Sequence, residues 1–156
     1  MTVILRDQLK GWSYTGPRID EIVPPEGITA ADFAKLQIPV GDRLWVLTRF
    51  MPESAVRPAA EQWARRACGS DVAFESDPEV LRALIRAEHE ATSTIPRAKV
   101  TLRSIQLRCL QALAEGDAWT VHRLAVMAAE RRRTTVVDQA AEVKLELEAQ
   151  LASLFA

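Results

Sequence analysis

From about Gly41 to the C-terminus, apolar residues recur every three or four positions, which is the spacing of amphipathic helices. Short turn signals separate these segments, so consecutive helices are expected to fold back on one another. The pattern predicts an all-α fold of five or six mostly antiparallel helices. They would form a bundle or a short layered helical array.

The first 40 residues have a different pattern, with four of the eight prolines of the chain. We interpret residues 1–40 as an irregular arm of a single domain, 1–156, whose helical body is residues 41–156. Over residues 3–9 periodicity does not decide between a short strand and a helix. Five apolar side chains are expected to hold the arm on the body: Trp12, Tyr14, Ile19, Ile22 and Val23.

Capping and breaking residues predict where the first helices begin and end. Thr29 with Asp32 predicts a short helix through Leu36, and Asp42 is expected to cap a helix over residues 43–50. The next helix is expected to have Pro58 in its first turn and to reach Cys68, before Gly69. Residues 76–79, Ser-Asp-Pro-Glu, predict the start of a helix that runs to about residue 92, with the serine as cap.

The last three helices are predicted over residues 97–115, 118–131 and 136–154. The first of these has two apolar stripes, so it is placed in the middle of the assembly. Gly116 and Asp117 form a tight connection that makes the second helix antiparallel to it. The final helix carries a narrow apolar seam, which consists of Val136, Ala140, Val143, Leu147, Leu151 and Leu154. Leu145 lies opposite this seam and is either an ordinary exposed leucine or a contact of a homodimer formed through this helix.

Composition excludes several classes of protein. The chain is 48% hydrophobic and 26% charged, which is typical of a globular domain. The N-terminus does not resemble a signal peptide, and no apolar run approaches the ~20 residues of a membrane-spanning helix. Cys68 and Cys109 have no ligand-spaced partner and are expected to be buried, reduced thiols. We therefore expect a cytoplasmic protein that neither enters a membrane nor carries a cofactor or metal.

Charge is unevenly distributed along the chain. Residues 97–133 carry eight basic side chains against three acidic ones, a net +5, although the whole chain has a net charge of −1. Such a stretch could attract phosphate groups. Alternatively, it could pair with acidic residues of the same chain, and we favour this interpretation.

Glu88 departs most clearly from its surroundings. Its helix presents Val80, Leu81, Leu84 and Ile85 on one face, and Glu88 continues that apolar stripe. A carboxylate there must be paired, hydrogen-bonded or neutral. Glu88 is thus either a recognition or proton-handling group at the mouth of a groove, or half of a structural salt bridge with an arginine such as Arg103 or Arg123. In both cases we expect less than a third of it to be exposed and a basic partner to lie nearby.

The remaining candidate residues are basic or aromatic. Arg131, Arg132 and Arg133 lie at a predicted helix end, where they would complement the helix dipole or, together with Arg108 and Arg123, contact phosphate. Trp119 falls on the polar side of its helix and could anchor an interface. His122 lies on an apolar flank and is interpreted as a core histidine.

Two segments carry a family resemblance. Residues 42–47, Asp-Arg-Leu-Trp-Val-Leu, and residues 60–67, Ala-Glu-Gln-Trp-Ala-Arg-Arg-Ala, resemble parts of a group of all-helical bacterial immunity proteins. The resemblance covers roughly residues 42–130. The later helices depart from it because they carry Ile, Leu and Met in place of alanine repeats, and the N-terminal arm has no counterpart. The resemblance implies a protein that binds another protein, with no catalytic residues to transfer.

The sequence therefore predicts a non-enzymatic, protein-binding module, immunity-like or regulatory. The candidate partner-binding residues are Glu88, Arg108, Trp119, Arg123, Arg131, Arg132 and Arg133. One alternative is a nucleic-acid-associated regulator that uses the basic stretch at residues 97–133. A second alternative is a small helical enzyme or ligand binder that uses Glu88 and His122.

Overall fold

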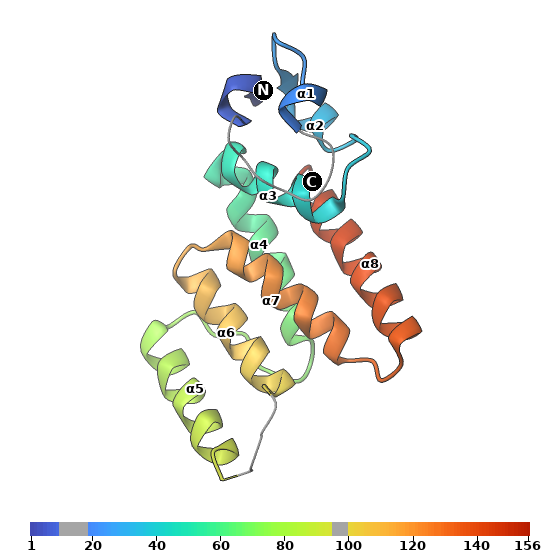
Figure 1. Cartoon of the computed structure of the whole chain (residues 1–156). Coiled ribbons are helices and arrows are strands. Elements are labelled where there is room, and N and C mark those ends of the chain that lie inside the picture. The colour runs from blue at the N-terminus through green and yellow to red at the C-terminus, as the bar shows by residue number, and fades with distance from the viewer. Residues whose placement is uncertain (10–18, 95–99) are drawn as a thin grey trace.

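The computed structural model describes residues 1–9, 19–94 and 100–156, and in these ranges the chain is mainly α-helical (Figure 1). The predicted all-α fold is confirmed. The elements, in chain order, are β1 (Val3–Ile4), the 3-10 helix η1 (Arg6–Leu9), α1 (Ile19–Ile22), β2 (Ile28–Thr29), α2 (Ala30–Phe33), α3 (Val40–Phe50), α4 (Glu53–Cys68), α5 (Pro78–Thr92), α6 (Leu102–Ala114), α7 (Ala118–Arg131) and α8 (Val136–Ser153).

The helices form a short layered array. α5, α6, α7 and α8 follow one another side by side, and α4 packs across α6, α7 and α8 (Figure 1). α3 contacts α7 and α8. The helix predicted to be central, α6, packs against α4, α5 and α7, which confirms its place inside the assembly. No helix in the described ranges has both the length and the hydrophobicity that crossing a bilayer requires.

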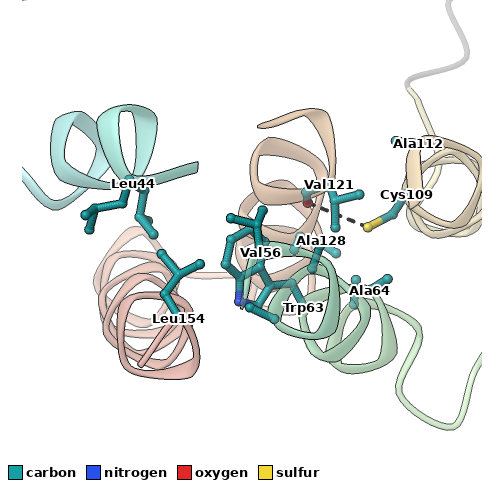
Figure 2. Packing of buried hydrophobic residues seen from close by; sticks show 14 of the residues in the cluster. Leu44, Val56, Trp63, Ala64, Cys109, Ala112, Val121, Ala128 and Leu154 are labelled. Atoms are coloured by element: carbon teal, nitrogen blue, oxygen red, sulfur yellow. Dashed lines mark hydrogen bonds between the residues drawn. The ribbon is translucent and has the colours of Figure 1, made fainter. Parts of the chain in front are cut away.

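The core lies where α4 meets α7 and α8. Trp63 of α4 is fully buried, and its indole Nε1 donates a hydrogen bond to Ser153 Oγ of α8 at 2.6 Å. Figure 2 shows Trp63 and Val56 beside α7, with Leu44 of α3 and Leu154 of α8 facing one another nearby. Full burial of a large aromatic side chain contributes on the order of 2–3 kcal/mol to stability.

Both cysteines are buried and free, as predicted. Cys109 Sγ lies 3.7 Å from the carbonyl oxygen of Val121, to which it donates (Figure 2). Burial raises the pKa of the Cys68 thiol to about 11 and raises that of Cys109 as well. Neither thiol is therefore poised to act as a nucleophile near neutral pH.

The N-terminal arm contains short regular elements. β1 pairs antiparallel with β2, with Val3 opposite Thr29 and Ile4 opposite Ile28. The Thr29 side chain accepts from the backbone N–H of Asp32, as predicted, but the helix it caps, α2, ends at Phe33. Val23 is buried in the common core, whereas Ile22 is exposed. Trp12 and Tyr14 lie outside the described residues, and the side chain of Ile19 does as well.

Several predicted helix starts are corrected by the structure. α3 begins at Val40 after Pro39, so Asp42 lies in the first turn and makes no capping hydrogen bond. α4 begins at Glu53, five residues before Pro58, because Pro52 occupies the capping position and the carbonyl left unpaired by Pro58 falls in an exposed first turn. The cap of α5 is Asp77, which accepts from the N–H of Glu79, and not Ser76.

The start of α6 is also corrected. This helix begins at Leu102 with Thr101 as its cap, so the described residues just before it, Val100 and Thr101, are not helical. Residues 97–99, which were predicted to form the start of this helix, lie outside the described ranges. The caps of the last two helices were predicted correctly: the Asp117 side chain accepts from the N–H of Thr120, and the Thr135 side chain accepts from that of Asp138.

The inward face of α8 contains only part of the predicted seam: Leu147, Leu151 and Leu154 pack against the core, whereas Ala140 is exposed. Its fully buried side chains, apart from Leu154, are polar: Glu146 and Gln150. Val136, the first residue of the predicted seam, is 81% exposed. The helix is rotated in this way because Glu146 and Gln150 find hydrogen-bond partners on α4 and α7.

Candidate functional site

Polar and apolar side chains surround a cleft between α5, α6 and α7. This cleft has a volume of about 430 Å³. Its apolar side chains come from all three helices, and hydroxyl, imidazole, carboxylate and guanidinium groups surround them. The lining residues are Ile85, Glu88, His89, Thr92, Ser93, Val100, Thr101, Ser104, Ile105, Arg108, Leu124 and Met127.

Glu88 is held at the edge of this cleft by two partners. Thr101 Oγ1 donates to its Oε1 at 2.8 Å, and Arg103 Nε lies 3.6 Å from its Oε2. The side chain of Glu88 is 16% exposed, which confirms the prediction that less than a third of it is exposed and that a basic residue lies nearby. Thr101 also accepts from the N–H of Ser104 as the cap of α6. The negative charge of Glu88 thus lies near the helix N-terminus, where the dipole favours it.

This arrangement gives Glu88 a structural role. It joins the end of α5 to the start of α6, and its charge is matched by Arg103. The stripe on which it lies is less buried than predicted, because only Leu81 is fully buried, Leu84 and Ile85 are half-buried, and Val80 is exposed. α5 is a peripheral helix that packs mainly on α6, so one side of its apolar stripe remains accessible.

Arg108 contributes the cation of the cleft. It is exposed and forms no ion pair with any residue that the structure describes. Across the cleft, α7 contributes Leu124 and the partly exposed Met127. Arg123, one helical turn before Met127, is also exposed and unpaired within the described ranges. Arginine and methionine beside an apolar floor are typical of protein interfaces.

The three consecutive arginines at the end of α7 do not act together. Arg132 donates from both terminal nitrogens to the last carbonyls of α4: Nη1 lies 3.0 Å from Arg66 O, and Nη2 bonds Ala67 O. Arg133 pairs with Glu142 at 2.7 Å. Arg131 is exposed and has no ion pair among the described residues. The helix-end role predicted for this group therefore falls to Arg132, and it acts on α4 rather than on its own helix.

Trp119 contacts the rest of the protein rather than projecting freely. Its ring meets Trp45 edge to face at 6.5 Å and lies 4.7 Å from the ring of His122. The guanidinium of Arg49 stacks 3.8 Å above Trp45 and 5.5 Å from Trp119. Trp119 also lines a second hollow with Arg49 and Asp117, away from the cleft of Glu88. The sequence missed this aromatic group because its members come from helices about 70 residues apart.

His122 is a buried histidine, as expected, and it belongs to a polar chain inside the protein. Its Nδ1 lies 2.5 Å from Gln150 Oε1, and Gln150 Nε2 donates to Glu146 Oε1 at 3.0 Å. Arg66 Nε donates to the other oxygen of Glu146 at 3.1 Å. Because the amide nitrogen of Gln150 faces a carboxylate, its oxygen faces His122, and His122 Nδ1 carries the hydrogen. Burial lowers the pKa of His122 from its ordinary value.

The structure does not bring Glu88 and His122 into one cleft: Glu88 faces the α5–α6–α7 cleft, and His122 faces α8. Among the described residues, no three His, Cys, Asp or Glu side chains are arranged to hold a metal ion. Met127 and Val100 were missed as cleft residues, since an apolar residue in a helical pattern is ordinarily assigned to the core. No protein-family model, curated protein or solved structure matches this chain.

Proposed function

We propose that this chain is a protein-binding module that receives a segment of its partner in the cleft between α5, α6 and α7. The observation that carries the proposal is the chemistry of this cleft: an apolar floor beside an exposed arginine that no described acidic residue neutralises. The other cleft charge, Glu88, is already matched by Arg103. The unmatched charge is therefore positive.

The apolar floor and the unmatched positive charge of the cleft define the kind of segment that the partner would insert. A carboxylate of the partner would pair with Arg108, and an apolar side chain would lie against Met127 and Leu124. Arg123, next to the cleft on α7, extends the positive surface. The resemblance to bacterial immunity proteins is consistent with a protein partner and would make that partner a toxin. A regulatory partner would use the same contacts.

Site-specific crosslinking tests the proposal. A photo-crosslinking amino acid would replace Val100, which lines the cleft, and in a control it would replace Gln62, an exposed residue of α4. Proteins captured at position 100 and not at 62 would then be purified. Their affinity would be measured for the wild-type chain, for Arg108→Glu and for the control Arg57→Glu.

We expect Arg108→Glu to weaken binding by about tenfold or more, since tenfold corresponds to roughly 1.4 kcal/mol. Arg57→Glu should leave the affinity unchanged, because Arg57 is exposed on α4 and is not part of the cleft. Equal capture at both positions, or equal affinity of the two variants, would show that the cleft is not the binding site.

The nucleic-acid alternative depends on the same arginines. Of the described basic residues between 100 and 133, Arg103, Arg132 and Arg133 are engaged within the protein, which leaves Arg108, Arg123 and Arg131. Electrophoretic mobility shifts with duplex DNA and with RNA at several salt concentrations test this alternative. Binding that weakens steeply with salt and is lost in Arg108→Glu would favour nucleic acid over protein.

A further inference from the structure

α8 presents exposed apolar residues on its outer face, whereas its inner face combines Leu147 with the buried polar residues Glu146 and Gln150. Glu146 and Gln150 point into the protein, whereas Val137 is 79% exposed on the opposite side. Phe155, just beyond the helix end, is also exposed. α8 lies at the edge of the array, with α7, α4 and α3 as its neighbours (Figure 1). Exposed apolar residues on a helix at the edge of the array mark a candidate interaction surface.

The exposed face has the spacing of a coiled coil. Successive positions along it are separated by four, three, four, three and four residues, which is the a/d repeat of a heptad. The residues at these positions are exposed except Leu151, which is half-buried and packs partly against the core. The six positions are Val137, Ala141, Lys144, Glu148, Leu151 and Phe155.

This face is complementary to itself when two copies run antiparallel. With the twofold axis level with residue 146, Val137 of one copy lies opposite Phe155 of the other. Ala141 then lies opposite Leu151, and Lys144 opposite Glu148. Each layer joins a small residue to a large one or a cation to an anion. Neither Lys144 nor Glu148 has an ion pair among the described residues of its own chain.

We propose that α8 docks a second copy of this chain as an antiparallel helix pair, so that the protein is a homodimer with Lys144 and Glu148 paired twice across the axis. A parallel arrangement would place each charge opposite its own kind. The charges therefore select the antiparallel register.

A groove at the C-terminal end of α8 is a second place where the other copy of the chain would bind. It has a volume of about 590 Å³. Its apolar lining residues are Ala31, Ala34, Val40, Leu151, Ala152 and Phe155, and its charged lining residues are Lys35, Arg43 and Glu148. Arg43 Nε is buried and has no hydrogen-bond partner among the described residues.

In the antiparallel pair, the start of the second α8 reaches this groove. Val136 and Val137, the two most exposed valines of the described chain, would enter it, and Asp138 would face Lys35 and Arg43. The two grooves extend the contact beyond the helices. This matters because a stable dimer buries roughly 1,200 Å² or more of total surface.

Charge reversal tests the dimer directly. The mass of the full chain in solution would be measured by sedimentation equilibrium for the wild type, Lys144→Glu, Glu148→Lys and the double variant Lys144→Glu/Glu148→Lys. We expect twice the 17.3 kDa chain mass for the wild type. Each single variant should weaken dimerisation at least tenfold, because it places like charges opposite each other. The double variant should restore it.

Two controls distinguish an effect on the dimer interface from an effect on the fold. Arg86→Glu, on the exposed surface of α5, makes the same kind of charge change outside the proposed face and should not affect the mass. Circular dichroism should show the same helicity for all variants, since positions 144 and 148 are exposed. A wild type that stays at the single-chain mass up to millimolar concentration would overturn the proposal. A double variant that stays as weak as the single ones would overturn it too.

Discussion

Gln150 is the side chain on which the docking of α8 depends most directly. It is fully buried and accepts from His122 Nδ1 while it donates to Glu146, so it links α7 to α8. We predict that Gln150→Leu destabilises the protein by about 2–4 kcal/mol. The substitution keeps much of the side-chain volume, so lost polar contacts and not a cavity account for the effect.

The predicted loss of stability comes from His122 and Glu146, the two groups that lose a hydrogen-bond partner. His122 Nδ1–H would be buried without an acceptor, which costs about 1–3 kcal/mol. Glu146 would lose the hydrogen bond from Gln150 but keep the one from Arg66, whose side chain is 37% exposed. Losing the Gln150 donor therefore costs nearer to about 1 kcal/mol. Together these losses are a large part of the roughly 5–15 kcal/mol that stabilises a domain.

A double-mutant cycle measured by urea unfolding isolates the His122–Gln150 contact. His122→Leu alone should cost about 1–3 kcal/mol because it leaves Gln150 Oε1 unpaired. The double variant should be less destabilised than the sum of the single ones, by at least about 1 kcal/mol, since neither polar group is then orphaned. Gln62→Leu, at an exposed glutamine, is the matched control and should change stability by less than about 0.5 kcal/mol. Additive single effects, or a Gln150→Leu variant as stable as the control, would refute the proposed linkage.

Two further predictions concern the same part of the molecule. Arg132→Ala should lower the free energy of unfolding by about 1–2 kcal/mol, because the last carbonyls of α4 lose their donors, although Gln106 still donates to Ala67 O at 2.9 Å. Arg131→Ala is the neighbouring control, and an equal loss there would show that net charge and not capping matters. The second prediction concerns pH. Burial lowers the pKa of His122 in the folded protein below its ordinary value of 6.5. At a pH between the folded and the unfolded pKa, His122 is therefore protonated in the unfolded chain but not in the folded one. The free energy of unfolding should therefore fall as pH decreases from about 7 to 5, and less so in His122→Asn; equal slopes in both proteins would contradict this.

Local chemistry allowed most of the fold to be predicted. Thr29, Asp117 and Thr135 were recognised as caps because their hydrogen bonds reach only three residues along the chain. The paired state of Glu88 was predictable for a different reason. A carboxylate on an apolar stripe requires a partner in any topology. Its cleft was not predictable, because that hollow depends on how far α5 extends past the surface of α6 and α7.

Contacts between distant residues account for what the sequence did not reveal. Arg132 caps a helix that ends 64 residues earlier, and only the packing of α7 beside α4 brings the two together. The polar part of the inward face of α8 was missed for the same reason, although Leu147, Leu151 and Leu154 of the predicted seam do pack against the core. The sequence pattern predicted the inward face of α8 from hydrophobicity alone. Glu146 and Gln150 nevertheless point inward, because Arg66 and His122 form hydrogen bonds with them.

The burial of Glu146 and Gln150 and the exposure of the row from Val137 to Phe155 therefore have one cause. If hydrophobicity alone oriented this helix, Val136 and Ala140 would be buried, and the register centred on residue 146 would not be presented to solvent. Directional hydrogen bonds fix the rotation, since a half-turn would leave a carboxylate, an amide and an imidazole unpaired, a cost well above that of a few exposed valines. The interior contacts of Gln150 thus determine which residues of α8 are offered to a second chain. The same helix thus determines both the polar contacts of the interior and the face that the proposed homodimer would use.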